Sequence, residues 1–501
     1  MDFQTYQSYD GLGLAKLVKD KNVSANELLD VAFGRLEEIN PRINAVIRSR
    51  QDKVYNELAN SNQYAPFFGV PILLKDISQA LKGEVLSSGS KLLKQNISSR
   101  DSHFVSKLRE AGFLFIGHTN TPEFGLKNIT EPTEYGATRN PWNLNHSPGG
   151  SSGGAAAAVA AGIVPIAGAS DGGGSIRIPA GFTGLFGLKP TRGRTPVGPG
   201  AGRQWQGASI DFVLSRSVRD SAALLDLLQT IQPAAAFHTP LFPDSYLDLV
   251  QKPVKKRYRI AFTTASPVRT PVSEAAKSAV GKMVDWLEKE GHVVEEVEAP
   301  IDGVKMMEYY YVMNCGEMNR VVSQLEQQMG RVLTLKDIEI FTWVLHKAGE
   351  SVTAAAYSEA LHGWDIAAEQ MAQFHRYYDF YLTPTNANAA PKVGELTPTE
   401  LEVEQLTLIE ELAPLRQQEL VYQMFLPSLT YTPYTQLANL TGQPAMSVPI
   451  SKNNQGLPIG VQFLASKGRE DLLLALASQI EQSDLWLERL NSTPKPNVLK
   501  A

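Results

Sequence analysis

Two glycine-rich turns that each carry serine lie close together in the sequence. The first is the run 149–154, Gly-Gly-Ser-Ser-Gly-Gly, and the second is the run 170–175, Ser-Asp-Gly-Gly-Gly-Ser. Glycine has no Cβ atom, so a turn rich in glycine lets backbone N–H groups approach a ligand closely. A serine hydroxyl becomes a nucleophile once a neighbouring base takes its proton. Two such turns that face one another would supply a nucleophile and an oxyanion hole, which acyl transfer requires.

The segment between the turns predicts how they are brought face to face. Residues 155–161 are mostly alanine, a strong helix former without bulk, and residues 163–169 are apolar and suited to a strand. A helix followed by a strand would return the chain, so that the second turn lies beside the first.

A candidate base follows a buried strand. Residues 67–74 form a continuous apolar run, the pattern of a strand covered on both faces, and Lys75 follows it. A lysine can accept a proton only when neutral, which means lowering its pKa from about 10.4 to roughly 7–8, at about 3–5 kcal/mol. Burial at the end of this strand would do so. Because Asp76 would oppose the shift, we expect its carboxylate to point away.

Helical and strand patterns alternate along the rest of the chain, which predicts an α/β sandwich with a central sheet. Ser24 and Glu27 form a capping box for a helix that Pro41 is expected to end. Long helices are predicted between residues 306 and 373. Further strands are predicted at 113–116, 258–263, 292–297 and 379–382, and at 445–450 and 458–464, which form a hairpin.

Composition narrows the class of protein. The chain has 501 residues, 43% of them hydrophobic and 20% charged, which is a globular balance. A net charge of −5 gives no reason to expect nucleic acid or an anionic membrane as a partner. Cys315 is the only cysteine, so an internal disulfide is excluded and a reducing, cytoplasmic setting is expected. We recognise neither a signal peptide nor a membrane-spanning run.

The spacing of the two turns is similar to that of the amidase signature family. Ser151 and Ser175 lie 24 positions apart, within Gly-Gly-Ser-Ser-Gly-Gly and Asp-Gly-Gly-Gly-Ser-Ile-Arg-Ile-Pro, and Lys75 matches the third catalytic position of that family. The runs 119–124, 187–190 and 442–449 also resemble the family. The resemblance implies a single α/β/α domain over residues 1–501, with a mixed sheet covered by helices. Its catalytic core would be residues 60–200, and residues 306–435 would wall the substrate pocket.

The resemblance also implies roles for individual residues. Ser175 would attack the carbonyl carbon and Ser151, preceded by a cis peptide bond, would relay its proton to Lys75. The oxyanion donors would be backbone N–H groups of the second turn, from Gly172, Gly173, Gly174 and Ser175 itself. Ser152, Asp171 and Arg177 match the supporting residues. The resemblance also implies a small-molecule amide substrate and a homodimer. Neither a cofactor nor a metal is expected, because no His, Cys or carboxylate cluster has ligand spacing.

Two other classes of protein would use similar sequence features. Gly149-x-Ser151-x-Gly153 fits the nucleophile elbow of α/β-hydrolases, but the run 140–143, Asn-Pro-Trp-Asn, provides no strand before it. A phosphate-binding loop would need Gly-x-x-x-x-Gly-Lys-Ser/Thr after a strand, and no such run occurs.

Within the family, two alternatives remain for the substrate. The flanks 130–132, 136–143 and 468–474 most resemble the branch that hydrolyses the cyclic dimer of 6-aminohexanoate, which implies a linear or cyclic aliphatic amide. In that branch, a cysteine corresponding to Cys315 would contact substrate, whereas a packed core thiol is the other possibility. The second alternative is the amidase subunit of a glutamyl-tRNA amidotransferase, which usually has threonine where this chain has Gly172.

Overall fold

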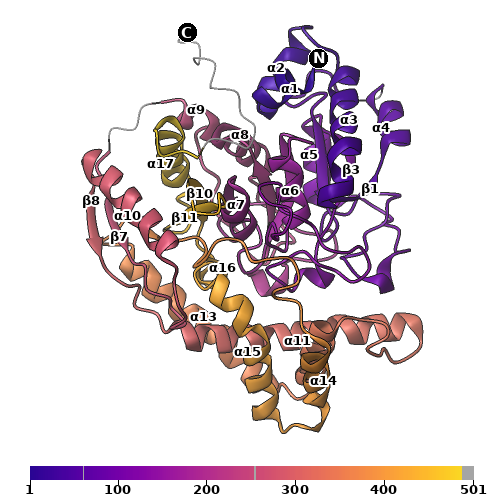
Figure 1. Cartoon of the computed structure of the whole chain (residues 1–501), viewed down its shortest axis with the longest axis vertical. Coiled ribbons are helices and arrows are strands. Elements are labelled where there is room, and N and C mark those ends of the chain that lie inside the picture. The colour runs from indigo at the N-terminus through magenta and orange to yellow at the C-terminus, as the bar shows by residue number, and fades with distance from the viewer. Residues whose placement is uncertain (60, 253–255, 488–501) are drawn as a thin grey trace.

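A mixed sheet runs through the molecule in the computed structural model, which describes residues 1–59, 61–252 and 256–487 (Figure 1). The sheet has eleven strands among these residues, in the order β1-β3-β2-β4-β6-β5-β10-β11-β9-β7-β8. β2 pairs in parallel with β3 and β4, and β7 with β8 and β9, while the other neighbours are antiparallel. The strands are β1 Val46–Ser49, β2 Pro71–Lys75, β3 Leu114–Thr119, β4 Ile166–Asp171, β5 Phe186–Lys189, β6 Ile210–Ser215, β7 Arg259–Phe262, β8 Val293–Glu296, β9 Phe380–Pro384, β10 Ala445–Lys452 and β11 Pro458–Ala465.

The mixed α/β fold with helices around the sheet is therefore confirmed, with local corrections. The strand expected over residues 67–74 is β2, which begins only at Pro71, since Gly69 adopts φ +83°, outside the extended region. The capping box of Ser24 and Glu27 is present, but helix α3 continues through Pro41 to Ile43 and ends at Asn44 in the left-handed conformation. The central strands β5 and β6 were not predicted.

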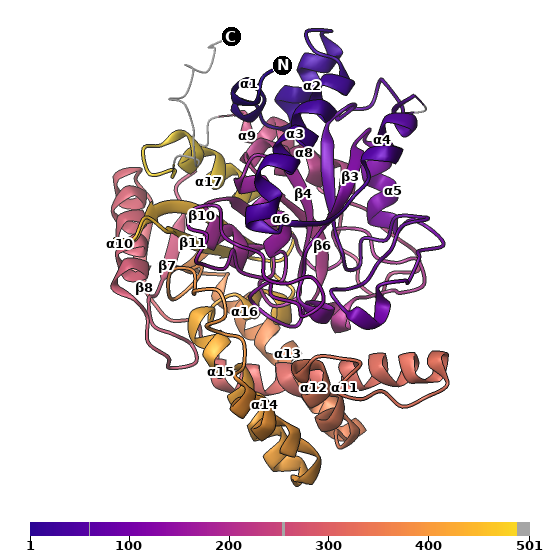
Figure 2. The ribbon, with the colours of Figure 1, turned by 45° about the vertical axis from the view of Figure 1, so that its right-hand side comes forward.

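Helices cover both faces of the sheet (Figures 1 and 2). Helix α6 connects the first serine turn to β4, as the alanine run predicts, and α7 follows the second turn. Outside residues 303–441, the helices are α1 Phe3–Ser8, α2 Gly11–Lys19, α3 Ala25–Ile43, α4 Gln51–Leu58, α5 His103–Glu110, α6 Gly153–Ala160, α7 Arg177–Thr183, α8 Val218–Leu228, α9 Tyr246–Val250, α10 Glu274–Lys289 and α17 Glu470–Gln482.

The remaining helices come from residues 303–441. They are α11 Gly303–Met329, α12 Ile340–Glu350, α13 Ala354–Phe374, α14 Glu400–Thr407, α15 Pro414–Tyr431 and α16 Gln436–Thr441. Among them, α11, α12, α14 and α15 extend away from the body of the sheet (Figure 2). Apolar side chains of α11, α12, α14 and α15 form a core of their own, in which Met318, Val344 and Leu429 are buried. By contrast, α13 and α16 pack against the strands of the sheet. Within the described ranges, no helix has the length and apolar character needed to cross a membrane.

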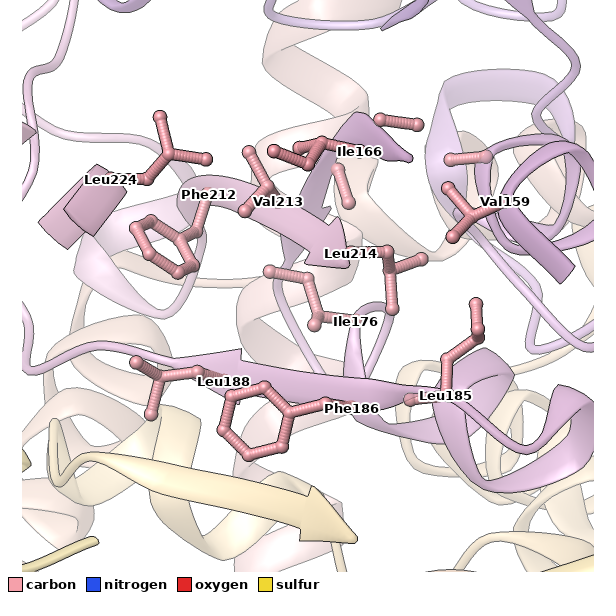
Figure 3. Packing of buried hydrophobic residues seen from close by; sticks show 14 of the residues in the cluster. Val159, Ile166, Ile176, Leu185, Phe186, Leu188, Phe212, Val213, Leu214 and Leu224 are labelled. Carbon is pink, nitrogen blue, oxygen red and sulfur yellow. The ribbon is translucent and has the colours of Figure 1, made fainter. Parts of the chain in front are cut away.

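The main core holds the centre of the sheet in place. Side chains of α6, β4, β5 and β6 point toward one another, among them Val159, Ile166, Phe186 and Leu214 (Figure 3). All four are at most 1% exposed. At roughly 25 cal/mol per Å² of apolar surface, this burial is the main force that fixes the strands from which the two serine turns extend.

Candidate active site

Lys75 and two serines meet at the end of β2. Lys75 is the last residue of the strand and is fully buried. Its Nζ lies 2.7 Å from Ser151 Oγ and 2.9 Å from Ser170 Oγ. The parallel pairing of β2 with β4 explains this contact, because both strands end at the same edge of the sheet and Ser170 lies at the end of β4.

The burial of Lys75 makes it a base at neutral pH. Removal from water lowers the pKa of its amine from 10.5 to about 7, against the opposing charges of Asp211 and Asp171. Asp76 does not add to that opposition, since its carboxylate accepts hydrogen bonds from Arg48 and from Ser87. As expected from the sequence, the neighbouring carboxylate is directed away from the lysine.

Ser151 occupies a tightly enclosed turn. The Gly150–Ser151 peptide bond is cis, as the family resemblance implies. A side chain at Gly150 would collide with the backbone of Ile129, whose carbonyl oxygen would lie 2.6 Å from the added Cβ. Ser151 is 3% exposed and lines a cavity of about 820 Å³. Its hydroxyl can therefore contact both a bound molecule and the amine of Lys75.

Ser175 and the second glycine turn line the same cavity. Ser170, Gly172, Gly173 and Ser175 all contribute to the lining. Ser152 ties the two turns together, because its Oγ donates to the carbonyl of Ser170 at 3.2 Å and its N–H donates to the carbonyl of Ser175 at 3.3 Å. The structure thus brings Lys75, Ser151 and Ser175 to one cavity.

Two hydroxyl groups fix the peptide planes of the glycine turn. The hydroxyl of Tyr310 donates to the carbonyl of Gly172 at 3.1 Å, and Thr435 Oγ1 donates to that of Gly173 at 2.7 Å. In a trans peptide the N–H points opposite to the carbonyl, so each bond also aims the next N–H. The N–H of Gly174 donates to the carboxylate of Asp171 at 2.8 Å. Among the three glycines expected as oxyanion donors, Gly174 is therefore engaged elsewhere, while Gly172 and Gly173 line the cavity.

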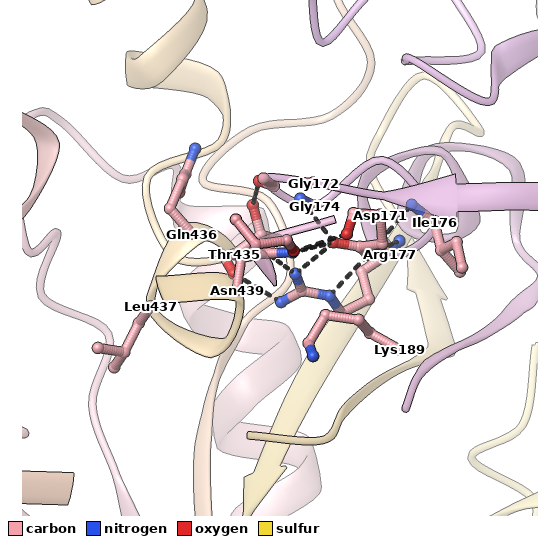
Figure 4. Close-up of polar contacts among 12 residues, drawn as sticks. Asp171, Gly172, Gly174, Ile176, Arg177, Lys189, Thr435, Gln436, Leu437 and Asn439 are labelled. Carbon is pink, nitrogen blue, oxygen red and sulfur yellow. Dashed lines mark hydrogen bonds and ion pairs between the residues drawn. The ribbon is translucent and has the colours of Figure 1, made fainter. Parts of the chain in front are cut away.

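A buried ion pair supports this turn from behind (Figure 4). The guanidinium of Arg177 donates to both carboxylate oxygens of Asp171, at 2.8 and 3.0 Å, and both side chains are inaccessible to solvent. Burial alone would raise the pKa of Asp171, but the charge and hydrogen bonds of Arg177 outweigh it and hold that pKa at about 2. Asp171 therefore stays ionised and keeps its bond to the N–H of Gly174.

The rest of the guanidinium is satisfied by distant parts of the chain. Arg177 donates to the carbonyl of Thr435 at 2.8 Å, to Gln462 at 2.6 Å and to Asn439 at 2.7 Å. Asn439 in turn donates to the carboxylate of Asp171 at 2.8 Å. Asn439, Gln462, Ser170 and Tyr310 are the site residues that sequence reasoning missed. Ser170 is the first residue of the second glycine turn and directly follows the strand predicted over residues 163–169, so the sequence could have identified it as a site residue.

Cys315 does not reach the cavity. The walls contributed by helix α11 are Tyr310, Tyr311, Asn314 and Met318 among others, whereas the lining does not include Cys315. Its thiol is fully buried in the core between the helices, and its carbonyl would lie 2.2 Å from a Cβ added to Gly349 of α12. Burial raises the pKa of this thiol to about 12. The placement favours the packed core thiol over a contact with substrate.

Comparison with known proteins extends the similarity over nearly the whole chain. The model of the amidase family matches residues 27–474. A lipoamidase of Enterococcus faecalis is 40% identical over 479 residues, which are 95% of this chain and 64% of the relative, so the chain spans less than two thirds of that protein. A 6-aminohexanoate-cyclic-dimer hydrolase of Paenarthrobacter ureafaciens is 36% identical over 494 residues, 96% of each chain. The structure of 6-aminohexanoate cyclic dimer hydrolase complexed with substrate matches with a TM-score of 0.85 at 34% identity, over 95% of this chain and 97% of that one.

Proposed function

Since the chain belongs to the amidase signature family and acts on the carbon–nitrogen bonds of amides, we propose that it hydrolyses aliphatic carboxamides through Ser175, Ser151 and Lys75. The observation that carries the proposal is the 2.7 Å contact between the buried amine of Lys75 and Ser151 Oγ, at a cavity that Ser175 also lines. Because the pKa of the Lys75 amine is about 7, roughly half of it is unprotonated at pH 7 and can accept a proton.

The proposed reaction has two halves. Ser175 Oγ attacks the carbonyl carbon while its proton passes to Ser151, whose own proton passes to Lys75. The resulting oxyanion accepts hydrogen bonds from the N–H groups of Gly172, Gly173 and Ser175 itself. When the carbon–nitrogen bond breaks, Lys75 returns the proton through Ser151 to the departing nitrogen. Water then attacks the acyl-enzyme ester in the same way, which releases the acid and restores Ser175.

The lining of the cavity supports an aliphatic substrate. Apolar side chains from three different segments make up much of the wall above the serines. They are Leu126, Met307, Tyr311, Met318, Phe425 and Leu429. Such a wall fits a chain of methylene groups on one side of the amide. The relatives named for lipoamide and for the cyclic dimer of 6-aminohexanoate are consistent with this, and we propose a linear or cyclic aliphatic amide as the substrate.

A panel of amides tests the proposal on the purified chain. It contains short aliphatic amides, lipoamide, linear and cyclic dimers of 6-aminohexanoate, and glutamine. Ser175→Ala should abolish turnover, and Lys75→Ala and Ser151→Ala should each lose orders of magnitude in kcat, while Ser99→Ala, at an exposed serine, should match the wild type. Near-normal turnover by Lys75→Ala would refute the mechanism. Ammonia release from glutamine alone among the panel would instead support the amidotransferase subunit.

A further inference from the structure

The outer part of the cavity carries an excess of positive charge. Arg100, Arg203 and Arg320 all contribute to its lining. Arg100 and Arg203 are exposed, and the side chain of Arg320 is 61% exposed. Side chains that line a cavity and still reach solvent lie at its mouth. The three arginines therefore mark the end of the cavity that opposes the buried serines.

The arginines come from segments that the structure holds together. The N–H of His103 donates to the carbonyl of Gly198 at 2.9 Å, which sets the loop of Arg100 beside the loop that leads to Arg203. Gln206 then donates to Glu317 of α11 at 2.6 Å. This bond fixes the turn after Arg203 against the helix that carries Arg320. The segments that carry the three arginines are thus held beside one another, and we call Arg100, Arg203 and Arg320 the arginine rim.

The acidic groups beside this rim already have partners. Asp101 accepts hydrogen bonds from Arg109 at 2.8 Å and from the N–H of Lys82 at 2.7 Å. Glu317 accepts from Gln206 and Tyr357 and pairs with Arg320 at 3.3 Å. Arg100 donates to the carbonyl of Pro199 at 3.5 Å. Within the described ranges, neither Arg100 nor Arg203 forms an ion pair, so two cations of the rim lack a carboxylate.

The distance from serines to rim sets the length of a matching substrate. Tyr310, which contacts Gly172 of the oxyanion turn, and Arg320 are ten residues apart on α11. At 1.5 Å per residue, this corresponds to roughly 15 Å along the helix axis. Along α11 between these levels the lining is mixed, with the apolar side chains of Tyr311 and Met318 beside the polar ones of Asn314 and Glu317. An amide held at the serines would place the far end of its aliphatic chain near the arginines.

We propose that the arginine rim binds a carboxylate at the end of the substrate's aliphatic chain. Guanidinium groups bind carboxylates through paired hydrogen bonds, and the rim provides two that no acidic side chain neutralises. The inference rests on the proposed amide hydrolysis at Ser175. If the rim binds a carboxylate, linear amides with a terminal carboxylate are better substrates than cyclic or neutral amides of the same chain length. The natural substrate then belongs to the class of linear amides with a terminal carboxylate.

The test compares two linear amides that differ only at the far end. One is the hexanoyl amide of 12-aminododecanoate, whose extended chain beyond the amide is about as long as the roughly 15 Å between the serines and the rim. The other is its analogue with a primary alcohol in place of the terminal carboxylate. The kcat/KM of the wild type should be about tenfold higher for the carboxylate compound than for the alcohol, mostly because its KM is lower. A ratio of this size corresponds to one charge-assisted hydrogen bond near the surface. The double variant Arg100→Ala/Arg203→Ala should bring that ratio close to one and leave the alcohol unaffected. Arg42→Ala, at an exposed arginine of α3, should retain the preference.

A binding measurement separates failure of the rim from failure of the proposed function. Ser175→Ala cannot turn over, and calorimetric titration of it with the same two compounds reports binding alone. If the carboxylate compound binds more tightly than the alcohol, and if adding Arg100→Ala/Arg203→Ala removes this difference, the rim is supported. Failure of the wild type to hydrolyse either compound would then overturn the proposed function but not the rim. Equal affinity for both compounds, binding of neither, or a preference that survives removal of both arginines overturns the inference.

Discussion

A carboxylate placed beside Lys75 would test whether its amine is the base. Ser170 Oγ lies 2.9 Å from Lys75 Nζ, and Ser170 lines the cavity without contributing to the proposed proton relay. Ser170→Asp puts a negative charge at this position, whereas Ser170→Asn provides nearly the same shape without charge. The two variants therefore differ in the electrostatic effect on Lys75 and in little else.

The expected effect follows from the pKa of Lys75. That pKa is about 7, so roughly half of the amine is neutral at pH 7. An opposite charge within hydrogen-bond distance favours the ammonium form and raises the pKa by about 1–3 units. A rise of about 2 units leaves roughly 1% of the amine neutral at pH 7, which lowers kcat/KM about 50-fold relative to Ser170→Asn.

The assay is the pH dependence of kcat/KM, which reports ionisations of the free enzyme. For the wild type, we expect kcat/KM to rise with pH and to level off above an inflection near pH 7. In Ser170→Asp the inflection should move to higher pH, so that the deficit relative to Ser170→Asn shrinks toward pH 10. If the two variants share one profile, or if the deficit is the same at every pH, Lys75 is not the titrating base and the reasoning from its burial is wrong.

Three further predictions concern residues around the site. Cys315→Leu should overpack the helical core around the thiol and cost about 1–3 kcal/mol of unfolding free energy, with unchanged substrate selectivity. An unchanged melting temperature together with a raised KM would place the thiol at the substrate. Asn439→Ala should lower kcat more than it raises KM, because it removes a partner of both Arg177 and Asp171; unaltered kcat in a folded variant would contradict this. Lys75→Met should melt at a higher temperature than the wild type near pH 7, and the difference should shrink toward pH 10.5. The reason is that the unfolded chain binds the lysine proton throughout this window and the native chain does not, so wild-type stability rises with pH.

The elements that position the candidate site were predictable from the sequence because they lie in local patterns, whereas the roles of Lys75, Ser151 and Ser175 came from the family resemblance. The two glycine turns, the alanine run between them and the apolar run before Lys75 each signal their own conformation over a few residues. The structure confirms the helix and strand between the turns as α6 and β4. The missed strand β5 gives a weak local signal, since it has only four residues, one of them glycine and one lysine.

The supporting contacts could not be predicted, because they join residues far apart in the chain. Arg177 and Gln462 are 285 positions apart, and Asn439 is 268 positions from Asp171. Asparagine and glutamine occur throughout the sequence without any local pattern that marks these two. For Cys315 the sequence left a contact with substrate and a packed core thiol open. It could not show that Tyr311 borders the cavity while the thiol of Cys315 lies in the helical core, 3.9 Å from Gln418 of α15.

The buried pair of Asp171 and Arg177 is better explained by positioning than by stability. Removing two charges from water costs about as much as their attraction returns, so such a pair adds little net stability. Its geometry, however, determines where the N–H of Gly174 points, and through Thr435 it also holds the carbonyl of Gly173 at the other side of the same peptide. The second glycine turn, residues 170–175, is thus held by Thr435, Asn439 and Gln462 from the last third of the chain. Substitutions there should change kcat by reorienting peptide planes, even where the catalytic side chains keep their places.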